Sequence, residues 1–163
     1  MLYNFIFDSD ALIKLTHSEI IFNVCKIFNC LITEEVKEEA VTEGKKRFYP
    51  DAFVIEKLIK NNLLKVRVPK RKLKIKESLG KGEISVLELH SGARKSIIIS
   101  DDSAFIKYLE SKNIVFFVPS DLIILLKKLD KISLKEALYF LDRMKVFIKE
   151  EVYNETKKEL KEV

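Results

Sequence analysis

Residues 96–105, SIIISDDSAF, point to the fold most directly, because a short apolar run is followed at once by polar residues and then by a helical pattern. The same order occurs at the start of the chain, where the apolar run Leu2–Phe7 ends at Asp8. Short apolar strands that alternate with helices are typical of a parallel sheet covered on both faces. We therefore predict an α/β fold in three layers, α/β/α, with a short central parallel sheet.

The segments between these two strands are predicted from apolar spacing and from capping residues. In chain order we expect a helix over 11–28, a strand over 30–32, a helix from the N-cap Thr33 to Gly44, a helix capped by Asp51, and a helix from Gly80 to Gly92.

The part of the chain after residue 100 is predicted to be mostly helical. A helix over 104–109 leads to a last strand over 114–118, and further helices start at Ser120 and Ser133. The sequence SLKE at 133–136 fits a capping box. We find no linker and no repeat, so we predict one domain over 1–163, with a core of about 2–120 and C-terminal helices over about 120–163.

The composition excludes several classes of protein. The 163 residues are 47% apolar and 34% charged, with 4 Gly and 3 Pro, which excludes a disordered tail or a collagen-like repeat. Cys25 and Cys30 are expected to be reduced core thiols, because two cysteines make no disulfide framework. No apolar run reaches 18 residues and no basic leader opens the chain, so we expect a cytoplasmic protein that contacts no membrane.

Acidic side chains follow two of the predicted strands. Asp8–Asp10 follows the first strand, and Ser100–Asp102 follows the strand at 96–100. The carboxyl ends of parallel strands meet at one edge of a sheet, where ligands bind. Carboxylates that gather there repel one another and raise each other's pKa unless a cation offsets their charge. Oxygen ligands without a Cys/His cluster indicate Mg²⁺ or Mn²⁺ rather than zinc.

Two glutamates are candidates to complete this cluster. Glu83 precedes Val86 and Leu87 by three and four residues, so it shares their inward helix face, where an unpaired carboxylate is costly. Glu39 lies beside the apolar stripe of Val36 and Ala40, but other glutamates surround it, as on a solvated helix. The residues alone favour Glu83 as functional and leave Glu39 undecided.

Four motifs in this order resemble those of the PIN-domain family of metal-dependent ribonucleases, which includes VapC-type toxins. They are FIFDSDALIKL, ITEEVKEEAV, LGKGEISVLELH and IIISDDSAF, and the resemblance covers about residues 2–120. The four catalytic and metal-binding acids that it implies are Asp8, Glu39, Glu83 and Asp102. Neighbouring residues are assigned as further metal ligands (Asp10, Asp101) and as supporting hydroxyls (Ser9, Ser100).

The resemblance also implies a mechanism and partners. One or two Mg²⁺ or Mn²⁺ ions would orient and deprotonate a water that attacks an RNA phosphodiester in line, which is the activity of an endoribonuclease. No side-chain nucleophile is needed. VapC-type toxins pair with a small antitoxin protein, and the family resemblance suggests homodimers, so a toxin role, an antitoxin partner and a homodimer are further expectations.

The positive charge is concentrated in KVRVPKRKLKIK, residues 65–76, which has seven basic residues and no acid. The whole chain has 30 basic and 25 acidic residues, so this segment holds all of the excess. Alternating charged and apolar residues are typical of a protected edge strand, whereas clustered cations are typical of an arm that contacts RNA phosphates, and both interpretations stay open. The candidate RNA-binding residues are Lys65, Arg67, Lys70, Arg71, Lys72, Lys74 and Lys76.

Two other functions fit part of the pattern. FIFDSD also resembles the opening of haloacid-dehalogenase-like phosphatases, with Asp8 as nucleophile and Asp10 as acid/base. That alternative leaves Glu39 and Glu83 unexplained, and the small Gly-Thr pair that usually follows is missing. The other alternative is a PIN-like scaffold that binds RNA or a partner protein without cutting, and the four acids argue against it.

Overall fold

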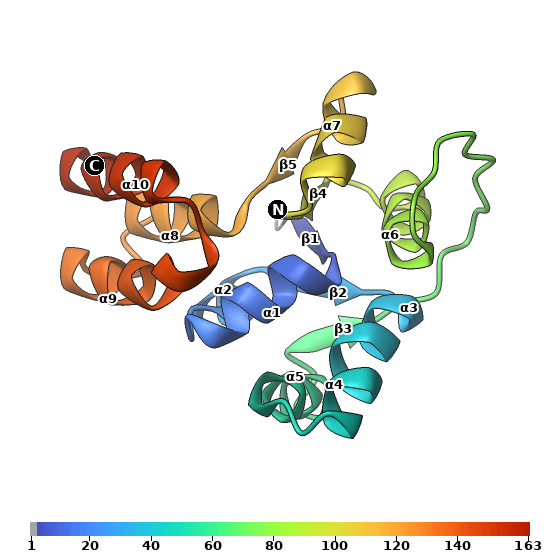
Figure 1. The fold of residues 1–163 in the computed structure, drawn as a ribbon, viewed down its shortest axis with the longest axis horizontal. Coiled ribbons are helices and arrows are strands. Elements are labelled where there is room, and N and C mark those ends of the chain that lie inside the picture. Colours follow the sequence, from blue (N-terminus) through green and yellow to red (C-terminus); the bar gives the residue numbers. More distant parts are fainter. Residues whose placement is uncertain (1–2) are drawn as a thin grey trace.

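A five-stranded parallel sheet is the centre of the computed structural model, which describes residues 3–163 (Figure 1). The strands lie in the order β3-β2-β1-β4-β5. β1 pairs with both β2 and β4, so that Phe5 lies beside Cys30 and Ile97. The predicted α/β fold is confirmed, although Leu2 lies outside the described residues. The strands are β1 Asn4–Phe7, β2 Asn29–Ile32, β3 Leu64–Val66, β4 Ser96–Ile99 and β5 Phe116–Phe117.

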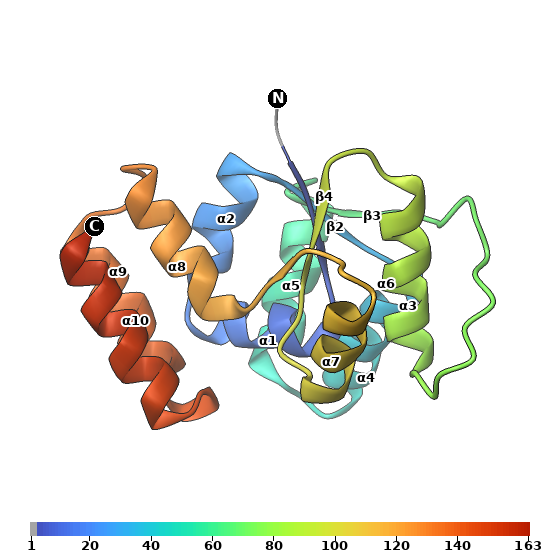
Figure 2. The ribbon, with the colours of Figure 1, turned by 90° about the horizontal axis from the view of Figure 1, so that it is seen from above.

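Helices cover both faces of this sheet (Figures 1 and 2). The chain runs outward from β1 to β3 and then returns to β4 on the other side of β1. Because such crossovers are right-handed, α1, α2 and α5 lie on one face and α6 and α7 on the other. The helices are α1 Ser9–His17, α2 Ile21–Ile27, α3 Glu34–Lys37, the π-helical turn η1 Glu38–Thr42, α4 Glu43–Lys46, α5 Pro50–Lys60, α6 Lys81–Gly92 and α7 Ser103–Ser111.

The C-terminal helices form a separate group beside α1, on the left in Figure 1. The capping box predicted at 133–136 is present, because Glu136 accepts the backbone N–H of Ser133 at 2.7 Å and donates its own N–H to Ser133 Oγ at 3.2 Å. Leu122, Leu141 and Leu160 are fully buried, so these helices share the hydrophobic core. They are α8 Pro119–Lys128, α9 Leu134–Met144, the short 3-10 helix η2 Lys145–Phe147, and α10 Glu150–Glu162.

The single helix predicted over 11–28 is wrong, because the structure has two helices, α1 and α2, with a turn between them. Glu19 in that turn has a positive φ of 69°, and Ser18 Oγ donates a hydrogen bond to the carbonyl of Leu15 at 3.1 Å. A side chain that bonds to the nearby backbone competes with the helical hydrogen bonds. The first helix therefore ends at this turn, and α2 follows and leads into β2.

The helix predicted from Thr33 to Gly44 begins as expected and ends differently. Thr33 Oγ1 accepts the backbone N–H of Val36 at 3.2 Å and so caps α3. Gly44, however, lies inside α4 rather than after the helix. A Cβ atom at this position would lie 2.8 Å from the Cβ of Ala52, so glycine permits α4 to pack closely on α5. Its role is close packing and not helix termination.

Three other boundaries differ from the prediction. Asp51 does not cap α5, which begins at Pro50, and its buried carboxylate lies 3.4 Å from Nε2 of His17. The strand predicted over 114–118 shortens to β5. In the basic segment, β3 is the edge strand of the sheet, and the backbone N–H of Arg67 just after it donates to the carbonyl of Ile32 at 2.9 Å. The following loop, up to α6, has no regular helix or strand and extends away from the body, on the right in Figure 2.

The two cysteines are buried, as predicted for core residues, and both are free thiols in the structure. Within residues 3–163, no helix is both long enough and apolar enough to cross a membrane.

Candidate active site

An acidic pocket lies at the carboxyl ends of β1 and β4, where the strand order reverses. It has a volume of about 130 Å³, and this edge of an open parallel sheet is where such folds bind ligands. The pocket collects side chains from four separate chain segments. Its lining residues are Asp8, Ser9, Asp10, Glu39, Gly80, Gly82, Glu83 and Asp102.

Asp8 is the most buried acid of the pocket, with 5% of its surface exposed. It is the N-cap of α1, and its Oδ1 accepts the backbone N–H of Ala11 at 2.8 Å. Its Oδ2 accepts a hydrogen bond from Ser100 Oγ. Burial raises the pKa of Asp8 to about 7, the two hydrogen bonds act against this rise, and the charges of Asp10 and Asp102 add to it.

Asp102 occupies the matching position after β4. It is the N-cap of α7, and its Oδ1 accepts the backbone N–H of Phe105 at 2.8 Å. Ser100 Oγ accepts the backbone N–H of Asp102 at 3.3 Å while it donates to Asp8. The Ser100 hydroxyl thus fixes the two strand-end aspartates relative to each other.

Glu39 enters the pocket from the π-helical turn η1. Its Oε2 accepts a hydrogen bond from Ser9 Oγ at 2.6 Å. Its Oε1 lies against Gly82, where an added Cβ atom would come within 2.7 Å of it. Glycine at position 82 therefore makes room for this carboxylate. A π-turn inserts one residue into a helix and changes the direction of the side chains in it, which is frequent at functional sites.

Glu83 stands in the first turn of α6, and its Oε2 accepts the backbone N–H of Gly80 at 2.8 Å. Partial burial raises the pKa of this carboxyl, the bond to Gly80 lowers it, and the nearby charges of Asp102, Glu39 and Asp10 raise it further. The carboxylates of the pocket therefore lie close enough to Glu83 for their charges to repel it.

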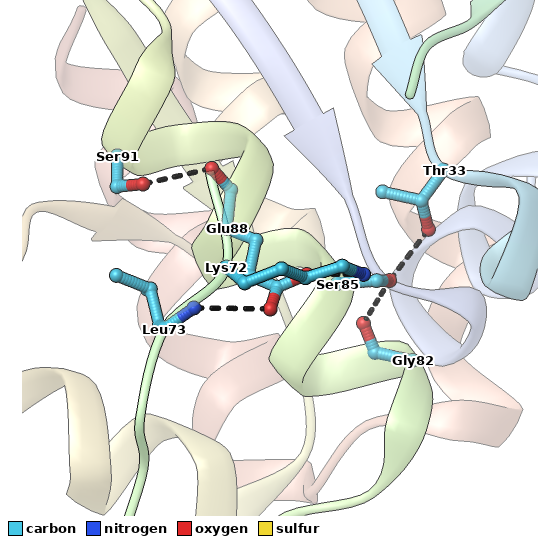
Figure 3. Close-up of polar contacts among 7 residues, drawn as sticks. All are labelled: Thr33, Lys72, Leu73, Gly82, Ser85, Glu88 and Ser91. Carbon is cyan, nitrogen blue, oxygen red and sulfur yellow. Dashed lines mark hydrogen bonds and ion pairs between the residues drawn. The ribbon is translucent and has the colours of Figure 1, made fainter. Parts of the chain in front are cut away.

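A chain of hydroxyl hydrogen bonds sets the distance between α3 and the start of α6 (Figure 3). Ser85 Oγ donates to the carbonyl of Gly82 at 2.7 Å, and Thr33 Oγ1 lies 2.7 Å from Ser85 Oγ. Since Ser85 uses its proton for Gly82, Thr33 is the donor to Ser85. This chain holds the segment that carries Glu83 next to the segment that carries Glu39.

The last two predicted metal ligands occupy different places. Asp10 is exposed and lines the acidic pocket. Asp101 pairs with Lys14 and lines another cavity, formed with residues of α7, α8 and η2. The structure thus brings together Asp8, Asp10, Glu39, Glu83 and Asp102, and it directs Asp101 away from them.

Comparison with known protein families gives one match over almost the whole chain. A family model described as PIN domain matches residues 4–162. The chain belongs to the PIN-domain family. Membership in this family indicates a nuclease-type function and RNA binding, and PIN domains typically use divalent metal ions. Searches of curated proteins and of solved structures give no match.

The donor set of this PIN domain fits a hard divalent cation. The pocket offers carboxylate oxygens, and no thiol or imidazole lines it, which is the ligand chemistry of Mg²⁺ and Mn²⁺. Burial raises the pKa of Asp8 and Glu83, and the charges of neighbouring carboxylates add to the rise; a bound cation would favour the ionised form of both groups. In the described part of the chain, no three acidic, His or Cys side chains already converge as a finished ligand set.

The structure adds one residue that the sequence reasoning missed. Glu88 of α6 is 4% exposed, and its Oε1 accepts the backbone N–H of Leu73 at 3.1 Å, while Oε2 lies 3.4 Å from Lys72 Nζ (Figure 3). It attaches the basic loop to the body of the PIN domain. The sequence does contain a signal that Glu88 is buried, because it is the one charged residue in the apolar run VLEL at 86–89.

The basic side chains of residues 65–76 differ in how they are used. Lys65 Nζ donates to Asn29 Oδ1 at 2.9 Å, toward the amino end of the sheet, and Arg67 donates to the carbonyl of Val66 at 2.9 Å. Four others are exposed and make no ion pair with the residues that the structure describes, namely Lys70, Arg71, Lys74 and Lys76.

Proposed function

We propose that this PIN domain is a metal-dependent endoribonuclease that hydrolyses RNA phosphodiester bonds with a water molecule as nucleophile. One observation carries the proposal: carboxylates from four distant segments share one small pocket at the switch point of the sheet. Single aspartates at strand ends commonly serve only as helix caps. Helix capping does not account for Glu39, which caps no helix and still lies in the pocket.

The four acids Asp8, Glu39, Glu83 and Asp102 would hold the cation, with Asp10 beside them. When bound, a divalent cation lowers the pKa of a water and stabilises negative charge on the phosphodiester. The protein's own part is orientation, because each of the four carboxylates has at least one oxygen fixed by a hydrogen bond, from Ala11, Ser9, Gly80 or Phe105. Asp8 has both oxygens fixed, since Ser100 donates to the second one. No donor from the described residues reaches the other oxygen of Glu39, Glu83 or Asp102, so these oxygens can serve an ion.

Serine chemistry is not supported by the geometry. Ser9 Oγ donates to Glu39 and Ser100 Oγ donates to Asp8, so both hydroxyls point at acids. A serine nucleophile needs a nearby base, usually histidine. His17 lies beside Asp51 and His90 beside Ser96, and neither lines the pocket. Ser9 and Ser100 therefore act as positioning hydroxyls in this proposal.

The exposed cations of the basic loop would bind the RNA backbone. Phosphate contacts by lysine and arginine supply affinity without reading sequence. Lys70, Arg71, Lys74 and Lys76 are the best placed for this role, because they have no partner among residues 3–163. A toxin role, an antitoxin partner and a homodimer stay predictions from the family resemblance.

The test is an RNA cleavage assay with Mn²⁺, with Mg²⁺ or with a chelator. We expect wild-type protein to cut single-stranded or structured RNA only with metal, and Asp8→Asn to lose at least about 100-fold in rate, because the cation loses its most buried ligand. Asp101→Asn is the matched control, since it removes a strand-end aspartate outside the pocket and should keep its rate.

Three results count against the proposal. No cleavage of any RNA with any metal would favour the scaffold that binds without cutting. Equal rates for wild type and Asp8→Asn would mean that the acidic pocket is not the site. A loss with Asp101→Asn as large as with Asp8→Asn would return Asp101 to the ligand set.

A further inference from the structure

A second cavity adjoins the acidic pocket. It has a volume of about 320 Å³ and shares three wall residues with that pocket, Ser9, Asp10 and Glu39. Ile13 and Ala40 add an apolar part to its wall. If the phosphodiester of a nucleic-acid strand lies in the acidic pocket, a neighbouring nucleotide of that strand would lie at this cavity.

The far wall of the cavity is a fixed turn, Arg47–Tyr49, that follows α4. The backbone N–H of Phe48 donates to the carbonyl of Lys45 at 3.0 Å, and that of Tyr49 donates to the carbonyl of Gly44 at 2.9 Å. Phe48 has a positive φ of 59°, a conformation that is unfavourable for a bulky side chain. Strained residues of this kind persist where the surrounding structure holds them, often at binding sites.

Arg47 differs from the two basic residues before it. Lys45 Nζ pairs with Glu56 at 2.8 Å, and Lys46 Nζ pairs with Glu43 at 2.8 Å. Arg47 is exposed, lines the cavity, and forms no ion pair with any residue in the described range 3–163. A planar guanidinium can bind a phosphate through two hydrogen bonds or stack on a nucleobase.

Aromatic side chains are exposed at the same turn. Tyr49 lines the cavity and is 48% exposed, and Phe48 beside it is 83% exposed. Proteins that bind single-stranded RNA stack its unpaired bases on such rings. An arginine without an ion pair and exposed aromatic rings, next to the acidic pocket, are the groups that bind the phosphates and bases of single-stranded RNA.

We propose that this cavity binds one unpaired nucleotide of single-stranded RNA next to the phosphodiester that is cut, with the base stacked on Tyr49 and a backbone phosphate held by Arg47. The inference rests on the proposed function, because it places the reacting phosphodiester at the acidic pocket. The carboxylates of Glu43 and Asp51, which also line the cavity, would repel a phosphate and accept N–H groups of a base. The base therefore lies inside and the phosphate at the rim.

The test measures binding of labelled single-stranded oligoribonucleotides to full-length protein that carries Asp8→Asn, so that the RNA is not cut. A set of probes is used in which one abasic position moves along the strand. Tyr49→Ala should bind intact RNA roughly 5- to 150-fold more weakly, because a stacked base is lost, and Tyr49→Phe should bind normally. Tyr139→Ala is the matched control, since this tyrosine of α9 is also 48% exposed but lies away from the cavity.

The abasic probes make the test specific for stacking. At one position along the strand, an abasic site should weaken RNA binding by the Asp8→Asn protein as much as Tyr49→Ala does. The same abasic site should not further weaken RNA binding by the protein that also carries Tyr49→Ala. Arg47→Ala should instead reduce the slope of log affinity against log salt by about 0.7, as expected for the loss of one contact to a single-stranded phosphate.

The failures of the two proposals can be told apart. Unchanged RNA affinity in Tyr49→Ala overturns the nucleotide site, while metal-dependent cleavage by the wild type still supports the nuclease. Weaker binding by Tyr49→Ala with a wild type that cuts no RNA would support nucleotide binding at this cavity, but it would overturn the nuclease proposal and with it the placement of the nucleotide beside a cut phosphodiester. A dimer that dissociates in Tyr49→Ala, with unchanged RNA affinity, would make the turn a contact between copies and overturn the site.

Discussion

The acidic pocket and the basic segment at 65–76 carry opposite charge and are built in opposite ways. The acids come from four distant parts of the chain, and each stands at a helix start or in a helical turn with one oxygen fixed by a hydrogen bond. The bases come from one continuous segment that has no regular helix or strand after β3. Groups that act on a reacting phosphate need exact placement, whereas groups that attract a backbone need mainly charge.

Two buried carboxylates show the same contrast. Asp8 in the pocket is 5% exposed and faces other acids, so its ionised form is unfavourable without a cation. Glu88 under the basic loop is 4% exposed, and it faces the N–H of Leu73 and the ammonium group of Lys72. Hydrogen bonds thus offset only part of the cost of burying Asp8, whereas Glu88 has a hydrogen-bond donor and a cation beside it.

The largest expected effect is a pH dependence of stability that comes from Asp8. Its pKa is about 7 in the folded protein and 3.8 ordinarily, so the folded state binds the proton more tightly than the unfolded state. Without metal, the free energy of unfolding should fall as the pH rises from about 4 to about 7, by at most about 4 kcal/mol. Asp8→Asn lacks this titration and should be the more stable protein at pH 8.

Urea unfolding of both proteins with a chelator, from pH 4 to pH 8, checks this expectation. Their difference in stability should grow with pH up to about 7 and then stay constant. Mn²⁺ should stabilise the wild type more than Asp8→Asn at pH 8. A difference that does not change with pH would show that burial does not disfavour the ionised form of Asp8, and the contrast between the two regions would be lost.

The second effect concerns the exact placement of Glu39. Gly82→Ala puts a methyl group 2.7 Å from Glu39 Oε1, and this flexible carboxylate must move, so the fold should survive. Misplacing a catalytic group by about 1 Å can reduce the rate about 100-fold, and we expect a loss of that order in RNA cleavage. Gly92→Ala in the same helix is the control, because nothing lies within 4 Å of its added Cβ. Equal rates for the two variants would mean that Glu39 is dispensable.

Much of this contrast could be predicted from the sequence, because local signals mark the strand ends. The runs at 2–7 and 96–100, each followed by aspartate, correctly place Asp8 and Asp102 at one edge of the sheet. Glu83 was predicted from its position in the first turn of a helix, three and four residues before the apolar Val86 and Leu87. In each case, the residue's place in its own element determines where it goes.

Glu39 and Glu88 show where local reasoning stops. Glu39 is one of several glutamates on its helix, and only the π-helical turn and the space at Gly82 direct it to the pocket. Glu88 was missed because its partner, the backbone N–H of Leu73, lies in a loop whose path no local pattern determines. Contacts between segments far apart in the sequence decide both cases.

The third effect is the loss of the loop's attachment. Glu88→Ala leaves the N–H of Leu73 without its acceptor, so we expect a loss of about 1–3 kcal/mol in the free energy of unfolding. RNA affinity should also fall, while the rate at saturating RNA should stay within a few fold of wild type. Glu88→Gln, which keeps an acceptor, should recover most of the stability. Glu77→Ala is the control, since Glu77 is exposed and its pair with Lys112 is a surface contact.

The smallest effect is expected for single residues of the basic loop. Replacing Arg71 or Lys74 by Gln should lower the slope of log affinity against log salt by about 0.7 for each phosphate contact that is lost. Sequence preference and the rate at saturating RNA should not change, because these side chains lie outside the acidic pocket. Lys135→Gln, an exposed lysine of α9, is the control and should leave the slope unchanged. If replacing Arg71 or Lys74 lowers the rate rather than the affinity, the loop must reach the reacting phosphate. The basic residues would then need exact placement, as the acids do, and the contrast between the two regions would be wrong.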